Sequence, residues 1–257
     1  PDVVIHCAAK VNVDQCEGEY DEAYQLHVKS TEAIANILNQ WGGHLVYIST
    51  DSVFDGEKEG PYTEEDTTNP LNNYAKTKLD GEFAALMCER NTLIRTNIFG
   101  WSRAGRLSFA EWVIKALVEK KPLHMFVDVF FTPIHVSDLA GIISNIIDEK
   151  IYGLYNIGGS DVVSKYDFAI KLAKIFDLPA DGIIKSTMNE CDFKAMRPKN
   201  MSLVSTKIEH ELGIQLPRLE EGIKLLKDQY HSGWLENIMS RTIGPGYNFS
   251  EEKYVEV

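Results

Sequence analysis

Three side chains within residues 45–82 could together transfer a proton: Thr50, Tyr74 and Lys78. A free phenol has a pKa of about 10 and is a poor acid or base at neutral pH. A nearby ammonium group favours the phenolate, so we expect Lys78 to lower the pKa of Tyr74. The hydroxyl of Thr50 could then hydrogen-bond a carbonyl or alkoxide. The trio predicts a proton-transfer site beside a C=O or C–OH group, although a bare Tyr-x-x-x-Lys spacing also arises by chance in amphipathic helices.

A strand and a helix must position these groups. The apolar run 45–48 predicts a buried strand that delivers Ser49 and Thr50 at its carboxyl end, the edge where open α/β sheets bind ligands. Past residue 70 the pattern becomes helical, and Tyr74 and Lys78 fall one turn apart on a shared surface. The apolar face of this predicted helix consists of Leu79, Phe83, Leu86 and Met87.

Further helices follow from periodicity and capping signals. A helical pattern around residues 30–40 places Ile34, Ile37 and Leu38 facing inward. Ser-x-x-acid spacings predict capping boxes at Ser108 and Ser164. A buried strand is predicted over residues 92–96.

The composition fits a soluble, enzyme-sized chain. Its 257 residues are 44% hydrophobic and 25% charged, with no run as long as a membrane span and no signal-peptide pattern. The formal net charge of −12 argues against a nucleic-acid surface. The seven histidines are scattered, so we expect no metal site. The cysteines lack paired spacing, and we expect reduced thiols and a cytoplasmic protein. These cysteines are Cys7, Cys16, Cys88 and Cys191.

Two motifs, YISTD-x-VFDG and GPYTEED-x-x-NPLN-x-YAKTKLDGE, contain the three chemical groups in register. This segment resembles the catalytic core of the extended short-chain dehydrogenase/reductase superfamily, most closely the dTDP-4-dehydrorhamnose reductases. The resemblance extends more loosely over residues 1–228. It implies an α/β fold with a doubly wound, Rossmann-like parallel sheet and a smaller mixed α/β substrate-binding part. The implied division assigns 1–101 and 125–140 to the first, 102–124 and 141–230 to the second, and 231–257 to an irregular tail.

A nicotinamide cofactor, NADP or NAD, is implied by the same resemblance. Dinucleotide sites place the pyrophosphate at a Gly-rich turn that opens a helix, and this sequence has no such turn in the required order. We therefore expect a chain that lacks the first βα units and, by itself, binds the cofactor weakly. The cofactor-binding residues that the resemblance implies are Ala8, Ala9, Lys10, Ser49, Tyr74, Lys78, Thr96 and Asn97.

The substrate implied is a nucleotide-linked sugar, and a homodimer is compatible with the family. The substrate-binding residues implied are Thr50, Asp51, Ser52, Ile98 and Arg197. At Ser52 and Ile98 the family often has aromatic residues that contact the deoxysugar, so we expect a different sugar nucleotide or none. At His27 the family usually has an asparagine that anchors a water behind the catalytic lysine.

Two functions remain open from the sequence. One is an NAD(P)-dependent reductase or epimerase, with Tyr74 as general acid/base, Lys78 tuning it and Thr50 polarising the carbonyl. The other is a non-catalytic member of the fold, similar to the regulatory subunit of methionine adenosyltransferase, which shares the VFDG and KTKLDGE stretches and binds a partner.

Overall fold

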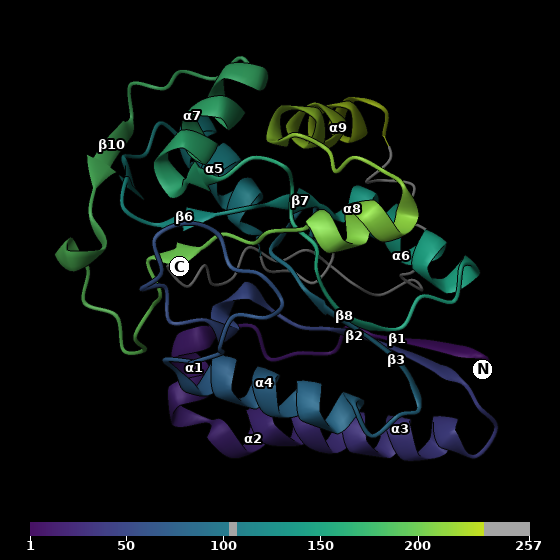
Figure 1. The fold of residues 1–257 in the computed structure, drawn as a ribbon. Helices are drawn as coiled ribbons and strands as arrows, with labels where there is room; N and C mark the ends of the chain where they lie inside the picture. Colours follow the sequence, from purple (N-terminus) through teal and green to yellow (C-terminus); the bar gives the residue numbers. More distant parts are fainter. Residues whose placement is uncertain (103–106, 234–257) are drawn as a thin grey trace, which may run out of the picture.

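Four parallel strands form the main sheet of the computed structural model, which describes residues 1–102 and 107–233 (Figure 1). In spatial order they are β1 (Val3–His6), β2 (His44–Ile48), β3 (Arg90–Arg95) and β8 (Gly153–Asn156). The register pairs Ile5 with Val46 and Ile48 with Ile94. Because all four strands run the same way, their carboxyl ends share one edge of the sheet. The strands predicted at 45–48 and 92–96 are both present, the second shifted by two residues at its start.

Helices from the first ninety residues cover one face of this sheet (Figure 1). They are α1 (Val13–Gly18), α2 (Tyr20–Tyr24), a π-helical turn (Gln25–Lys29), α3 (Ser30–Asn39) and α4 (Asn73–Ala85). Leu38 of α3 and Ala85 of α4 pack on Leu45, Tyr47 and Leu93 of the sheet. The helix α4 approaches closely because Gly81 has no side chain; a Cβ there would lie 2.6 Å from the backbone oxygen of the π-helical turn.

The outward face of α4 differs from the usual amphipathic pattern. Phe83 in α4 is 59% exposed, and Leu86 and Met87, directly after its end, are 54% and 52% exposed, so these residues do not form the buried apolar face that was predicted. The packed face instead carries small and polar residues, among them Lys78 and Glu82, because the close contact at Gly81 leaves room for little else. Ile37 of α3 is also exposed, so the inward orientation predicted for it was wrong.

The opposite face of the sheet is covered by α6 (Val136–Asp148) and α8 (Thr206–Leu212), as the view in Figure 1 shows. Ile142 and Ile146 of α6 and Ile208 of α8 pack against Val46 and Ile94. Helices on both faces of a parallel sheet are the predicted doubly wound arrangement. The strand β1 lies at one end of the described sheet, and its Ile5 is 46% exposed, so the described residues do not cover this strand on both faces.

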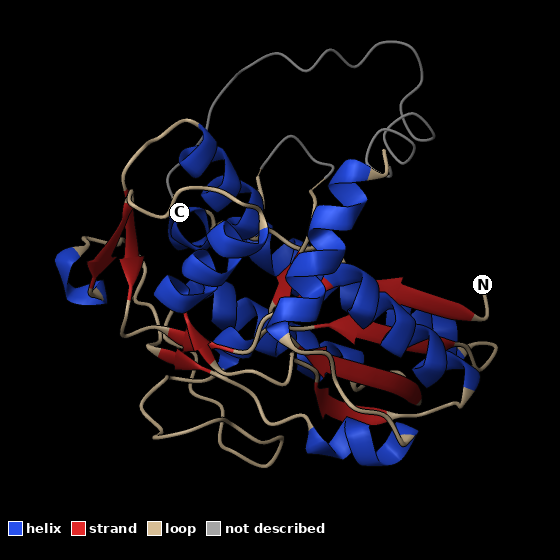
Figure 2. Ribbon diagram, turned by 90° about the horizontal axis from the view of Figure 1, so that it is seen from above, coloured by secondary structure: helices blue, strands red, loops and turns tan. Residues whose placement is uncertain are grey.

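A second core gathers the smaller part of the molecule around three helices (Figure 2). These are α5 (Phe109–Val118), α7 (Lys165–Ile175) and α9 (Leu219–His231). The accompanying strand pairs are β5 (Leu123–Phe126) with β10 (Ile183–Ser186), β6 (Phe130–Phe131) with both β9 (Val163–Ser164) and β11 (Asn200–Met201), and β4 (Ile98–Phe99) with β7 (Ile134–His135). Two 3₁₀ turns lie at Asp51–Val53 and Met188–Glu190. The capping box predicted at Ser108 is confirmed. At Ser164 only the N-cap is present: its side chain accepts from the backbone N–H of Asp167, and the Asp167 carboxylate accepts from the Ser164 hydroxyl.

The boundary predicted between the two parts does not coincide with the extent of the main sheet. Residues 153–156 pair with β3, and α6 packs on the main sheet, although 153–156 and residues 141–148 of α6 fall within the range assigned to the substrate-binding part. Their contacts place them with the main sheet. The predicted tail at 231–257 lies outside the described residues beyond Gly233.

Candidate active site

The carboxyl end of β2 positions Thr50 against the phenol of Tyr74. Thr50 is 6% exposed and caps the 3₁₀ turn that follows, accepting a 3.1 Å hydrogen bond from the backbone N–H of Ser52. Tyr74 lies in the first turn of α4, which Asn72 opens by accepting from the backbone N–H of Ala75 at 2.9 Å. A side-chain hydrogen bond links Thr50 and Tyr74 and by itself lowers the pKa of the phenol, so the two predicted catalytic groups meet.

Burial dominates the electrostatics of Tyr74. It raises the pKa of the phenol to about 12, and the negative charge of Asp51 acts in the same direction, while the hydrogen bond from Thr50 opposes them. The phenol therefore carries its proton throughout the neutral range. In this state Tyr74 can donate a proton to a developing alkoxide rather than remove one.

The ammonium of Lys78 contacts the backbone of β2 and does not tune Tyr74 as predicted. The side chain is 2% exposed, its Nζ donates to the carbonyl of Ile48 at 2.7 Å, and it lies 4.1 Å from the centroid of the Tyr47 ring. Burial lowers the pKa of Lys78 to about 7, which Glu82 and Cys7 partly oppose. The groups that shift the pKa of Tyr74 do not include Lys78. The pKa of Tyr74 is thus raised and not lowered as predicted. Burial dominates it, and the ammonium of Lys78 faces the carbonyl of Ile48.

A buried ion pair beneath the site was missed by the sequence analysis. Glu82 and Arg95 are 3% and 5% exposed and pair at 2.7 Å. Ser49, predicted to contact the cofactor, instead donates to Glu82 at 2.5 Å. The hydroxyl at the strand end thereby joins β2 to α4. The YAKTKLDGE motif contains Glu82, but nothing local in the sequence indicates its partner.

Asp51 forms the centre of a second buried cluster beside Thr50. It is 1% exposed, and its Oδ1 accepts from the hydroxyls of Thr50 (3.2 Å) and Ser52 (3.3 Å). Its Oδ2 accepts from Asn97 Nδ2 at 2.6 Å. Burial raises the pKa of Asp51. Asn97, predicted to contact the cofactor, therefore has its amide committed to Asp51.

His27 connects the segment after β1 to the helix α4. Its Nε2 accepts from the backbone N–H of Lys10 at 2.8 Å, so Nδ1 must carry the proton that it shares with Thr77 Oγ1 at 2.8 Å. Burial, assisted by Lys78, lowers the pKa of His27 to about 3. The imidazole is therefore neutral and has no free acceptor. It forms a fixed link between the two segments, because both of its nitrogens are hydrogen-bonded.

Two predicted basic ligands are engaged elsewhere. The side chain of Lys10 pairs with Glu19 and with Glu22, the latter at 2.6 Å. Arg197 pairs with Asp14 at 3.0 Å and lies over the ring of Phe193. Ile98, in β4, is 42% exposed. Neither Lys10 nor Arg197 has a side-chain hydrogen bond to the cluster around Thr50 within the described residues.

The residues after β1 and β3 fit the nicotinamide half of a dinucleotide. Ala8 and Ala9 follow β1 with side chains small enough for a flat ligand to lie close. Thr96, at the end of β3, has a buried Oγ1 with no hydrogen-bond partner in the described part of the chain. A buried unpaired hydroxyl is costly, so a polar ligand group at this edge would stabilise it.

The wall contributed by the smaller part contains a lysine that the sequence analysis overlooked. Lys165 opens α7, and its Nζ lies 3.5 Å from the centroid of Phe131 and 4.5 Å from that of Phe109. Met201, paired with Phe131 in the sheet, contacts the hydroxyl of Ser52 through its sulfur at 3.8 Å. Ser52 thus touches this wall.

One family model, the RmlD substrate binding domain, matches residues 1–232. The chain belongs to this family. Methionine adenosyltransferase 2 subunit beta of Mus musculus is 35% identical over 243 residues, 87% of this chain and 69% of that protein. The dTDP-4-dehydrorhamnose reductase of Salmonella typhimurium is 32% identical over 239 residues, 87% of this chain and 78% of that enzyme.

Solved structures of RmlD-type proteins share the fold. A dTDP-4-dehydrorhamnose reductase of Clostridium acetobutylicum superposes with a TM-score of 0.84 at 32% identity, covering 90% of this chain and 81% of that one. The reductase of Bacillus anthracis, solved in complex with NADP, gives 0.83 at 28% identity, covering 89% and 81%. These matches confirm the predicted superfamily, the predicted fold class and the prediction of an NAD(P)-dependent oxidoreductase.

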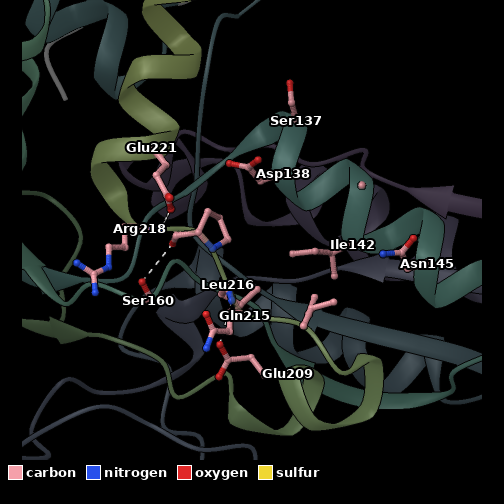
Figure 3. Close-up of a pocket in the computed structure, with 13 residues that line it drawn as sticks. Ser137, Asp138, Ile142, Asn145, Ser160, Glu209, Gln215, Leu216, Arg218 and Glu221 are labelled. Atoms are coloured by element: carbon pink, nitrogen blue, oxygen red, sulfur yellow. Dashed lines mark hydrogen bonds between the residues drawn. The ribbon is translucent and has the colours of Figure 1, made fainter.

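A separate open groove of about 890 Å³ lies among α6, α8 and α9 (Figure 3). It is on the opposite side of the main sheet from α4 (Figure 1). Asp138, Glu209, Arg218 and Glu221 line it. Two of these carboxylates serve the backbone, because Glu209 accepts from Leu216 N–H and Glu221 from Arg218 N–H. None of the residues predicted for catalysis or binding lines this groove.

Neither a cluster of metal-ligating side chains nor a membrane-spanning helix occurs in residues 1–102 and 107–233. No group of three or more His, Cys, Asp or Glu side chains in these ranges is arranged to hold a metal ion. No helix in the same ranges combines the length and apolar character needed to cross a membrane. All four cysteines are free thiols.

Proposed function

We propose that this chain reduces the carbonyl group of a nucleotide-linked keto-sugar with NADP or NAD, and that Tyr74 supplies the proton. The observation that carries the proposal is the contact between Thr50 and the protonated Tyr74 at the carboxyl edge of the sheet. Ligands of open α/β sheets bind at this edge. Membership of a family that includes dTDP-4-dehydrorhamnose reductases supports the class of substrate.

The side chains of this site have different roles in the proposed reaction. Thr50 hydrogen-bonds the substrate oxygen and holds it next to the Tyr74 hydroxyl, which donates its proton as negative charge develops. Lys78 secures the backbone at Ile48 and contributes positive charge near Cys7 and His27. A bound nicotinamide cofactor supplies the hydride. Ala8, Ala9 and the unpaired hydroxyl of Thr96 would hold that cofactor at the strand ends.

The substrate we propose is a nucleotide sugar other than dTDP-4-dehydrorhamnose. Aromatic contacts to a sugar contribute roughly 0.5–1.5 kcal/mol each beyond buried area. Ser52 and Ile98 provide no ring, and Ser52 offers a hydroxyl on the substrate side. A sugar with an additional hydroxyl or amide substituent suits this surface better than a deoxysugar.

A second candidate function is a non-catalytic subunit that binds a partner enzyme. The 35% identity to methionine adenosyltransferase 2 subunit beta favours it, together with the neutral, fully hydrogen-bonded His27 in place of a water-anchoring asparagine. The retained contact between Thr50 and Tyr74 favours the reductase.

The decisive experiment is Tyr74→Phe in the full-length protein, which removes only the proton donor. Turnover of the preferred nucleotide sugar, followed by cofactor absorbance, should fall by about 10²–10⁴-fold while cofactor affinity barely changes. Near-normal turnover by the Phe variant would show the catalytic assignment to be wrong. A panel of keto-sugar nucleotides tests the substrate, and the highest kcat/KM on dTDP-4-dehydrorhamnose would contradict our choice.

A further inference from the structure

The ammonium group of Lys165 has no acceptor in the described part of the chain. Its backbone N–H donates to the carbonyl of Val129, but its Nζ makes no hydrogen bond or ion pair with any described residue. The Nζ is instead held against the faces of Phe131 and Phe109. Two aromatic faces favour the cation electrostatically, yet they leave all three of its N–H donors unused.

Asp51 is the charged group that acts on this ammonium. Its charge raises the pKa of Lys165, although burial dominates and lowers that pKa to about 8. The two residues nevertheless form no salt bridge, so a gap separates the ammonium from the carboxylate. On Asp51, Oδ1 accepts two hydrogen bonds and Oδ2 accepts one, from Asn97. A carboxylate offers about four acceptor positions, which leaves one on Oδ2.

The surroundings place this pair at the candidate active site. Asp51 directly follows Thr50, and its neighbour Ser52 contacts Met201. Met201 pairs with Phe131, whose ring carries the ammonium of Lys165. The unused donors and the unused acceptor therefore belong to the two walls that meet beside Thr50.

We propose that Lys165 and Asp51 together bind one hydroxyl group of the substrate's sugar, and that Lys165 is a specificity-determining residue. The hydroxyl oxygen accepts from Lys165 Nζ, and its proton is donated to Asp51 Oδ2. A sugar with hydrogen in place of that hydroxyl leaves the Lys165 ammonium without an acceptor and one acceptor position of Asp51 unused, so it is rejected. This inference rests on the proposed function, in that it assumes a sugar as ligand.

The test is calorimetric binding of dTDP-glucose and UDP-glucose to the full-length protein, followed by monodeoxy analogues of the tighter ligand. These probes need no hydride transfer. We expect removal of the hydroxyl at one carbon to weaken binding to the unaltered protein by about 10- to 100-fold, as for hydrogen bonds to charged groups. Lys165→Met, which preserves length and packing, should weaken binding of the parent sugar similarly and then show no further loss with that analogue.

Matched variants make the result specific. Lys174→Met removes an exposed charge from the same helix and should leave every affinity unchanged. Lys165→Arg keeps a donor and should retain part of the discrimination, so it also serves if the Met variant fails to fold. The inference is overturned if neither glucose nucleotide binds, if Lys165→Met binds the parent sugar normally, or if all analogues lose equally. It is also overturned if Lys165 instead confers preference for a glucuronate nucleotide, because that would make the ligand group a carboxylate.

The outcome is separable from that of the proposed reaction. Tyr74→Phe should keep the discrimination among deoxy analogues while losing turnover. If Tyr74→Phe retains turnover but the Lys165 coupling is present, the catalytic assignment fails and the hydroxyl site stands. If turnover depends on Tyr74 but the coupling is absent, the reverse holds.

Discussion

Two lysines, the buried Lys78 and the half-buried Lys165, belong to the two parts of the molecule that meet at Thr50. Lys78 on α4 donates to a backbone carbonyl of the main sheet, whereas Lys165 on α7 lies over two phenyl rings and donates to nothing described. Burial lowers the pKa of both, to about 7 and about 8. The comparison shows that a buried cation can be fixed by the fold or left available to a ligand, and that only its acceptors distinguish the two.

The largest expected difference between the lysines is kinetic. Lys78→Met should lower kcat by about 10²-fold, because it removes the hydrogen bond that fixes the backbone at Ile48, two residues before Thr50. Lys165→Met should raise KM by about 10- to 100-fold and change kcat little, because it removes a binding contact. Steady-state kinetics on the preferred nucleotide sugar measure both. Equal effects on kcat from the two variants would erase the distinction.

A buried ion pair also contributes to the stability of the main-sheet part. Glu82→Gln or Arg95→Met should lower the free energy of unfolding by about 3–5 kcal/mol, because each leaves a buried charge unpaired. Urea denaturation measures this. The control is Lys58→Met, which breaks the more exposed pair with Asp66 and should cost less than about 1 kcal/mol. A similar small loss at Glu82 would mean that water reaches the buried pair.

The pH range over which stability changes should differ between the Lys78→Met and Lys165→Met variants. For a lysine whose folded-state pKa is lowered, the unfolded chain binds more protons between the two pKa values, so stability rises with pH there. The Met variant escapes the cost of the buried cation, so its stability relative to the unaltered protein should fall as pH rises. The slope is on the order of 1 kcal/mol per pH unit.

For Lys78→Met this change should begin near pH 7 and for Lys165→Met near pH 8, in both cases ending near the unfolded value of about 10.5. Urea denaturation at pH 7, 8, 9 and 10 gives the differences. A flat difference for either variant would show that its ammonium is not buried at a cost. The Lys174→Met variant provides the baseline.

The smallest effect is expected on the outward face of α4. Phe83→Ser should change the free energy of unfolding by no more than about 0.5 kcal/mol, because the ring is 59% exposed. Phe131→Ala, in the wall that holds Lys165, should cost about 3–5 kcal/mol as a buried ring. Thermal melts of both variants at equal concentration compare them. A large loss from Phe83→Ser would indicate that this face is covered in solution.

The sequence by itself determined the groups that short-range chemistry fixes. The strands at β2 and β3 follow from apolar runs, and the helix starts at Ser108 and Ser164 follow from side chains that cap a backbone only three residues away. Thr50 and Tyr74 were predictable as neighbours because a strand end and the helix that opens after it share one edge of a parallel sheet.

Only the tertiary structure decided which way the side chains face and which ones pair. The close contact at Gly81 turned Phe83 outward and buried Glu82, and no local pattern could show this. Arg95 meets Glu82, and Lys165 reaches the site of Asp51, across 13 and 114 residues of chain. Charges and rings so far apart in sequence meet only after the sheet and the second core have formed, so their partners, and with them the pKa values of Tyr74 and Lys78, depend on the fold.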